Sequence, residues 1–318
     1  MRFRITHSNQ EGIPLVNLHD EETGAIVSIA PEQGAMLHAF IVQSESGPVN
    51  IINNYQNIGD IHENLSLSYK SSKLSPFPCR IENGRYEWDG KEYVFANRFP
   101  DGSAIHGLLF NKHFTIKEQE TTAYFAAILF EYDYQAEDPG YPFAYRCQIR
   151  YTLLHDNTLQ VQTILQNASD QVIPIADGWH PYFQLGEKVD DCTLRFPSKG
   201  MLEFSEKLIP TGAIIPYDNF NTGKRFGDTQ LDNCFLVDPT ADQPVCELSN
   251  PALGLSIRFH TDEHYPYLQL YTPPARKSIA IENLSSAPNC FNNKIGLLTL
   301  NPGETINLTL HYSVQTIN

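Results

Sequence analysis

The chain has 318 residues, of which 41% are hydrophobic, so it can bury a substantial core and is not expected to be disordered throughout. Its 37 acidic and 22 basic residues give a formal net charge of −15, which repels phosphate backbones and anionic lipids. Nucleic acid and membrane surfaces are therefore excluded as expected partners. A neutral small molecule, such as a monosaccharide, is compatible with this charge.

No segment has the pattern of a targeting or membrane-spanning sequence. The first ten residues, MRFRITHSNQ, lack the apolar core of a secretory signal peptide. The apolar run over residues 124–130 is far too short to cross a bilayer. The six cysteines are scattered without a C-x-x-C pair, which predicts reduced thiols rather than disulfides or metal ligands; they are Cys79, Cys147, Cys192, Cys234, Cys246 and Cys290. We expect a cytoplasmic protein.

The first half of the chain is predicted to form short strands. Residues 27–30 and 37–41 have the pattern of an early strand pair. Residues 57–73 fit either a short helix or an irregular loop. Residues 85–88 and 92–95 flank Asp89-Gly90, a dipeptide suited to a tight turn with positive φ.

The second half continues in the same way. Residues 147–154 and 158–165 alternate apolar and polar side chains around a turn at 155–157, which predicts a hairpin. Residues 295–300 and 305–314 flank another turn, Asn301-Pro302-Gly303-Glu304. Sustained helical periodicity is almost absent, and no linker or repeat divides the chain. We therefore predict an all-β fold, a single domain over residues 1–318 that forms one large antiparallel β-sandwich with few short helices.

The strongest candidate for chemistry is His180, in the run DGWHPYF over residues 177–183. Pro181 biases His180 toward extended backbone geometry. An imidazole here could titrate near neutral pH and donate a proton, and the aromatic neighbours could stack on the apolar face of a sugar ring. A histidine satisfied within an aromatic core explains the run equally well.

The second candidate is Glu282, in the apolar run IAIENL over residues 279–284. A buried glutamate is costly unless it is paired or functional, so this residue could be a general base whose pKa is tuned by burial. The alternative is a glutamate at a strand end that turns to solvent.

Three further residues carry weaker signals. His106 precedes Gly107, where a missing side chain would let backbone or ligand approach closely, but it could equally be a loop histidine. Arg80 could hold substrate oxygens with its planar fork of donors, although most arginines are simply exposed. Asp232 could accept a hydrogen bond from a hydroxyl, although a turn aspartate explains it as well.

Other catalytic and cofactor motifs are missing. The sequence has no Walker-type glycine loop, no G-x-G-x-x-G after a strand, no G-x-S-x-G elbow and no H-E-x-x-H. A metal site built from the 11 histidines is possible, but no pair shows ligand spacing on a recognisable scaffold, so no metal is expected.

Taken together, several segments resemble the aldose 1-epimerase (galactose mutarotase) family. They are CRIENGRY at 79–86, IHG at 105–107, GWHPYF at 178–183, LDN at 231–233, and IE at 281–282 followed by PNCFN at 288–292. The resemblance implies a large β-sandwich with a sugar cleft on a concave face and no cofactor. It also implies that Glu282 is the catalytic base, that His180 is the catalytic acid, and that Arg80, His106 and Asp232 bind a monosaccharide. A monomer or homodimer is expected.

The chain departs from the family pattern in two places. Leu108 stands where well-known members usually have a second glycine, and Trp179 and Gln184 stand where they often have asparagine. These changes bear on the identity of the sugar more than on the reaction. The chain also lacks the His-Gly-Phe-Ala-Arg type of motif that we associate with hexose-6-phosphate mutarotases.

The proposed chemistry requires Glu282 and His180 to converge on opposite edges of one bound pyranose. Two other interpretations remain open. One is a non-catalytic sugar-binding or regulatory protein on the same scaffold. The other is a glycoside hydrolase that uses Asp232 and Glu282, which would need carboxyl groups about 5–5.5 Å or 6.5–9.5 Å apart.

Overall fold

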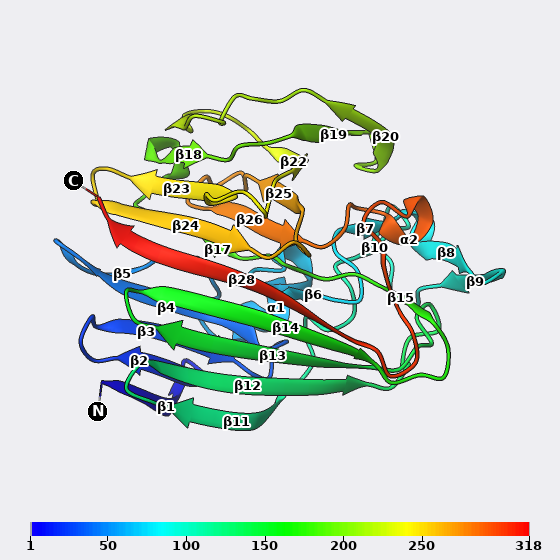
Figure 1. The fold of residues 1–318 in the computed structure, drawn as a ribbon, viewed down its shortest axis with the longest axis horizontal. Coiled ribbons are helices and arrows are strands. Elements are labelled where there is room, and N and C mark those ends of the chain that lie inside the picture. Colours follow the sequence, from blue (N-terminus) through cyan, green and yellow to red (C-terminus); the bar gives the residue numbers. More distant parts are fainter. Residues whose placement is uncertain (1, 318) are drawn as a thin grey trace.

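Antiparallel strands dominate the structure, a computed structural model that describes residues 2–317 (Figure 1). The largest sheet faces the viewer in Figure 1 and has nine strands. Their order is β11 (Thr115–Thr121), β12 (Phe125–Tyr134), β13 (Tyr145–Leu154), β14 (Thr158–Asn167), β28 (Thr305–Thr316), β24 (Leu255–Thr261), β23 (Cys246–Asn250), β18 (Thr193–Arg195) and β21 (Lys224–Arg225).

Two further sheets lie behind the nine-stranded sheet. The eight-stranded sheet has the order β20 (Pro210–Ile215), β19 (Gly200–Phe204), β22 (Asp232–Leu236), β25 (Tyr267–Tyr271), β26 (Ile279–Leu284), β16 (Gly178–Trp179) and β6 (Lys73–Leu74), and β17 (Tyr182–Phe183) also pairs with β26. The five-stranded sheet consists of β1 (Phe3–Gln10), β2 (Ile13–Asp20), β3 (Ala25–Ala30), β4 (Met36–Ser44) and β5 (Gly47–Asn50).

Small elements complete the fold. The strand pairs are β7 (Arg80–Ile81) with β10 (Ala104–Ile105), β8 (Arg85–Trp88) with β9 (Lys91–Val94), and β15 (Ile173–Ile175) with β27 (Leu298–Leu300). The helices are α1 (Ile58–Ser68), α2 (Cys290–Asn293) and two 3₁₀ turns at Glu82–Gly84 and Val189–Asp191. The predicted all-β antiparallel sandwich with few short helices is confirmed.

The core lies between the two layers. In β14 buried and partly exposed residues alternate along the whole strand, as expected when one face meets the core and the other meets water. Phe183 on β17 contacts Phe259 on β24 and Tyr312 on β28, with ring centroids 4.8 and 5.2 Å apart. These aromatic contacts join the eight-stranded sheet to the nine-stranded sheet.

Most of the predicted local elements are present. β3 pairs with β4, β8 pairs with β9 across Asp89-Gly90, and β13 pairs with β14 across residues 155–157. Of the two alternatives for residues 57–73, the structure contains the helix. Helix α1 begins after Asn57, whose side-chain Oδ1 accepts a 2.9 Å hydrogen bond from the Asp60 amide as an N-cap.

The last predicted strand before the C-terminal turn is shorter than expected. Strand β27 begins only at Leu298 and pairs with β15, whereas β28 pairs with β14 and β24. Residues before Leu298 cannot extend because Gly296 has a φ of 72° and lies against Tyr267, where a Cβ would come within 2.7 Å of the ring. The turn at 301–304 thus connects strands of different sheets.

All six cysteines are buried and free, in keeping with the prediction of unpaired thiols. Among residues 2–317, no helix combines the length and the apolar character needed to cross a membrane.

Candidate active site

A cleft of about 720 Å³ opens between the eight-stranded sheet and the segment around α1. All five residues singled out in the sequence line it, although they come from distant parts of the chain; they are Arg80, His106, His180, Asp232 and Glu282. The structure therefore brings together every predicted site residue in one cavity.

Glu282 reaches the cleft because of its position on β26. This strand pairs with β25 on one side and with β16 and β17 on the other, and all six of its residues are buried. Side chains alternate along a strand, so Ile281 packs in the core while Glu282 faces the cleft. The carboxylate is only 2% exposed, and its Oε2 has no protein hydrogen-bond partner.

His180 lies in the break between β16 and β17. Its backbone amide donates to Ser72 O at 3.1 Å, and its carbonyl accepts from the Ser71 amide at 2.9 Å. The next residue, Pro181, has no N–H to continue the ladder. The imidazole Nε2 lies 3.3 Å from Glu282 Oε1, and the ring stacks on Tyr182 with centroids 5.1 Å apart and an interplanar angle of 20°.

His106 completes a group of three. Its φ of 59° and the φ of 74° at Gly107 turn the chain sharply after β10. Gly107 is required because a Cβ there would lie 2.3 Å from Ser75 O, so the predicted close approach is one of backbone to backbone. The His106 ring lies edge-on to His180, with centroids 5.0 Å apart. One side-chain ligand atom from each of His106, His180 and Glu282 lies within 4.8 Å of the other two.

Asp232 joins the cluster through strand register. Gln269 lies directly opposite Glu282 across β25 and β26, and Asp232 lies diagonally from Gln269 across β22 and β25. Gln269 Nε2 donates to Asp232 Oδ1 at 2.9 Å, while its own Oε1 is buried without a partner. Gln269 was not predicted from the sequence. Its only signal there is a polar residue between Leu268 and Leu270 in an apolar run.

Arg80 lines the same cleft but already has a partner. Its guanidinium donates to Asp101 Oδ2 at 2.7 Å, from the loop that follows β9. Its backbone carbonyl accepts from the Asn289 amide at 2.6 Å, and Asn289 Oδ1 in turn accepts from the Glu82 amide. Two sequence motifs far apart in the chain therefore pack against each other. Asp101 was also missed from the sequence, where it looks like an ordinary loop aspartate.

A buried ion pair lies directly behind the strands that carry His180 and Glu282. Lys73 on β6 contacts Asp177, and both side chains are completely inaccessible. Lys73 Nζ also donates to Thr163 Oγ1 on β14 and lies 4.3 Å from the centroid of the Trp179 ring. Tyr265 donates its hydroxyl to Asp177 at 2.7 Å. This network ties β6 and β16 to the opposite sheet.

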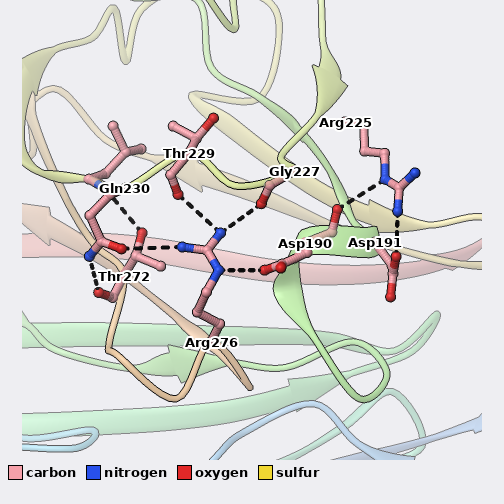
Figure 2. A network of polar contacts seen from close by, with 9 residues as sticks. Asp190, Asp191, Arg225, Gly227, Thr229, Gln230, Thr272 and Arg276 are labelled. Carbon is pink, nitrogen blue, oxygen red and sulfur yellow. Dashed lines mark hydrogen bonds and ion pairs between the residues drawn. The ribbon is translucent and has the colours of Figure 1, made fainter.

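Arg276 anchors one wall of the cleft (Figure 2). Its guanidinium donates to Asp190 Oδ1 at 2.7 Å and to the carbonyls of Gly227 and Thr229 at 2.6 and 3.1 Å. Gln230 joins the network by accepting from Arg276 at 3.2 Å. The neighbouring residues Pro273, Pro274, Ala275 and Lys277 line the cleft, so this wall is held in place from behind.

Burial controls the protonation of the cluster. Burial and, to a smaller extent, the carboxylate of Asp232 raise the pKa of Glu282 well above its ordinary range. Burial lowers the pKa of His180 to about 4, and burial with the nearby charges of His180 and Arg80 lowers the pKa of His106 as well. Burial also raises the pKa of Asp232. Neutral forms of Glu282 and His180 are thus favoured, so the pair carries one proton.

This arrangement is suited to proton exchange. Two titratable groups 3.3 Å apart, with one proton between them, can together accept a proton from one ligand atom and donate one to another. The side chains of His106, Asp232 and Gln269 surround the pair with further polar groups for ligand hydroxyls.

Comparisons with known proteins agree in the family that they indicate. A sequence profile described as aldose 1-epimerase matches residues 15–313. The uncharacterized protein YihR of Escherichia coli (strain K12) is 29% identical over 247 residues, which cover 76% of this chain and 78% of YihR.

Two solved structures have the same fold. A galactose mutarotase-like protein from Clostridium acetobutylicum superposes with a TM-score of 0.88 at 17% identity, covering 99% of both chains. The galactose 1-epimerase from Lactobacillus acidophilus NCFM superposes with a TM-score of 0.81 at 17% identity, covering 100% of both chains.

Proposed function

This chain belongs to the aldose 1-epimerase family, and from that premise we propose that it interconverts the α and β anomers of a free aldose. In this proposal Glu282 is the general base and His180 is the general acid. The observation that supports it most directly is the 3.3 Å separation of His180 Nε2 and Glu282 Oε1 inside one cleft.

Ring opening needs two proton transfers around a single carbon. The proton on the C1 hydroxyl leaves while the ring oxygen, which is bonded to the same C1, gains a proton. When the single proton shared by the pair is on His180, the Glu282 carboxylate accepts the first proton and His180 supplies the second. The aldehyde then rotates about its C1–C2 bond and closes on the other face, with the two residues exchanging roles.

The closeness of the two side chains fits this chemistry. We expected them on opposite edges of the sugar, whereas they lie side by side. Because the two reacting oxygens share one carbon, adjacent groups can serve both. Each proton-transfer group typically contributes about 10²–10⁴-fold to the rate.

The remaining polar residues are proposed to bind and orient the sugar. Asp232 and Gln269 are hydrogen-bonded to each other, and the free Oε1 of Gln269 is available to accept from a hydroxyl. Arg80 and His106 also line the cleft, from β7 and from the turn after β10, the two strands being paired. Orientation of the ring by such contacts lowers the barrier by keeping the reacting atoms aligned.

A mutarotation assay over a small panel of free aldoses tests the proposal. Fresh α-glucose and α-galactose are dissolved with the purified chain, and the relaxation of optical rotation is followed by polarimetry. We expect relaxation faster than the buffer rate for at least one sugar. Sugar binding by calorimetry without faster relaxation would instead support a non-catalytic carbohydrate-binding protein.

A further inference from the structure

The three clustered side chains in the cleft also have the donor set of a transition-metal site. His106 and His180 offer imidazole nitrogens and Glu282 offers a carboxylate oxygen, all within 4.8 Å of one another. Two imidazoles and one carboxylate, with a further position open, form a known donor set for zinc. Magnesium and calcium instead prefer sets made only of oxygen.

One side of this triangle has the length of a zinc coordination edge. Zinc binds nitrogen and oxygen at 2.0–2.2 Å, so two ligands at a tetrahedral angle lie about 3.3–3.5 Å apart. His180 Nε2 and Glu282 Oε1 are 3.3 Å apart. The ligand atom of His106 lies within 4.8 Å of the other two, so its ring needs to shift only slightly to reach the same ion.

Each of the three side chains also has one polar atom without a protein partner. His106 Nδ1, His180 Nδ1 and Glu282 Oε2 are buried and have no hydrogen-bond partner, whereas His180 Nε2 and Glu282 Oε1 contact each other. A bound ligand would give such atoms the partners that buried polar groups usually have. The carboxylate of Asp232 adds negative charge beside Glu282, and the guanidinium of Arg80, which also lines the cleft, is paired with Asp101.

We propose that His106, His180 and Glu282 form a binding site for one divalent ion of the zinc class. The open coordination position faces the cleft, so the ion and a sugar occupy the same space. If the proposed function is correct, the ion also occupies the lone pairs of His180 and Glu282 that proton transfer requires. It therefore inhibits mutarotation in competition with the sugar.

Cobalt(II) titration of the full chain tests the site without relying on activity. We expect one ion per chain, with the visible absorption of a low-coordinate cobalt site and without a thiolate-to-cobalt charge-transfer band. That band would place the metal on cysteine instead. Zinc is then added to displace the cobalt, and calorimetry of this displacement gives the affinity for zinc. Polarimetry with galactose as the substrate measures how strongly zinc inhibits mutarotation.

Variants locate the metal. His106→Asn and Glu282→Gln should each weaken binding by at least about tenfold. Asparagine is chosen because it tolerates the positive φ at position 106. His260→Gln, on β24 of the nine-stranded sheet and opposite His311 on β28, is the matched control for adventitious imidazole binding and should leave the affinity for the metal unchanged.

Three results would overturn the site: no binding by the parent chain, unchanged affinity in both cleft variants, or a cysteine signature. Metal binding without mutarotation would leave the site standing and refute the proposed function. If the chain catalyses mutarotation but binds no cobalt, and millimolar zinc leaves the rate unaffected, the proposed function stands and the metal site is refuted.

Discussion

Lys73 Nζ lies 2.5 Å from Asp177 Oδ1, and neither side chain is exposed to solvent. Lys73 is on β6, and Asp177 immediately precedes β16, which leads directly to His180. The Asp177 amide donates to Ser285 Oγ, and the Ser285 amide donates to Asp177 O, so the pair is also bonded to the end of the strand that carries Glu282. A charged pair thus supports the site from inside the sandwich.

Removing one partner of this pair should be severely destabilising. Lys73→Met leaves Asp177 buried without its cation, and we expect a loss of about 3–5 kcal/mol in the free energy of unfolding. In the double variant Lys73→Met, Asp177→Leu no charge remains buried, so much of that loss should return. Urea denaturation followed by circular dichroism measures both.

The control is Lys112→Met, which breaks a partly exposed pair with Glu137. Its effect should stay below about 1 kcal/mol. If Lys73→Met lowers the free energy of unfolding no more than Lys112→Met does, the ion pair between Lys73 and Asp177 does not stabilise the fold.

Glu282→Gln and His180→Asn should each slow catalysed mutarotation by about 10²–10⁴-fold. The double variant should be little slower than the worse single variant, because residues that act as one unit are not additive. Polarimetric relaxation provides the rates, and circular dichroism checks that the fold is retained. Near-normal relaxation in either single variant would remove that residue from the mechanism.

The pH profile should have an acid limb near pH 4. Burial lowers the pKa of His180 to about 4, so above this pH the pair with Glu282 holds one proton and can both accept and donate. Below it the imidazole binds a second proton and no base remains. We expect kcat/KM to be level near neutral pH and to fall as pH approaches 4, in buffers where the chain stays folded. A limb at the ordinary histidine value of about 6.5 would contradict this.

Asp232→Ala should weaken sugar binding more than it slows the chemical step. The substitution removes an acceptor in the cleft and leaves Gln269 Nε2 without its partner. A single lost hydrogen bond to a charged group corresponds to about 1.5–3 kcal/mol, or roughly a 10–100-fold rise in KM. Initial rates over a range of galactose concentrations separate KM from kcat. If neither constant changes, Asp232 takes no part in binding.

Acid stability should depend in part on His38, a buried histidine on β4 outside the cleft. Burial lowers its pKa, so the unfolded chain binds more protons than the folded chain as pH falls below about 6.5. Folding stability is therefore lost with falling pH through this group. His38→Gln should flatten the slope of the unfolding free energy against pH by at most about 1.4 kcal/mol per pH unit. His155→Gln, at an exposed site, is the matched control for replacing a histidine.

Local signals in the sequence predicted much of this architecture. Alternation and turn residues located the hairpins β8–β9 and β13–β14 because those elements pair with their neighbours in the chain. The five motifs, taken in order, also singled out five of the residues that line the cleft. These motifs could be noticed because they contain residue types that strands seldom bury, such as the glutamate of β26.

Gln269 and Asp101 could not be predicted because nothing local distinguishes them. Gln269 matters through its register opposite Glu282, and register between β25 and β26 is decided by packing across the whole sheet. Asp101 matters because its loop folds back onto Arg80. The metal-like geometry of the three cleft residues likewise arises only when strands from three regions of the chain meet.

The burial of all six thiols makes the native chain a clean background for site-directed labelling. Burial raises the pKa of Cys147 and Cys192 to about 12, so thiolate, the form that maleimides attack, is scarce in both. Leu67, 70% exposed at the rim of the cleft, is a natural place for one added cysteine. A fluorophore attached there would report the arrival of a sugar or an ion optically.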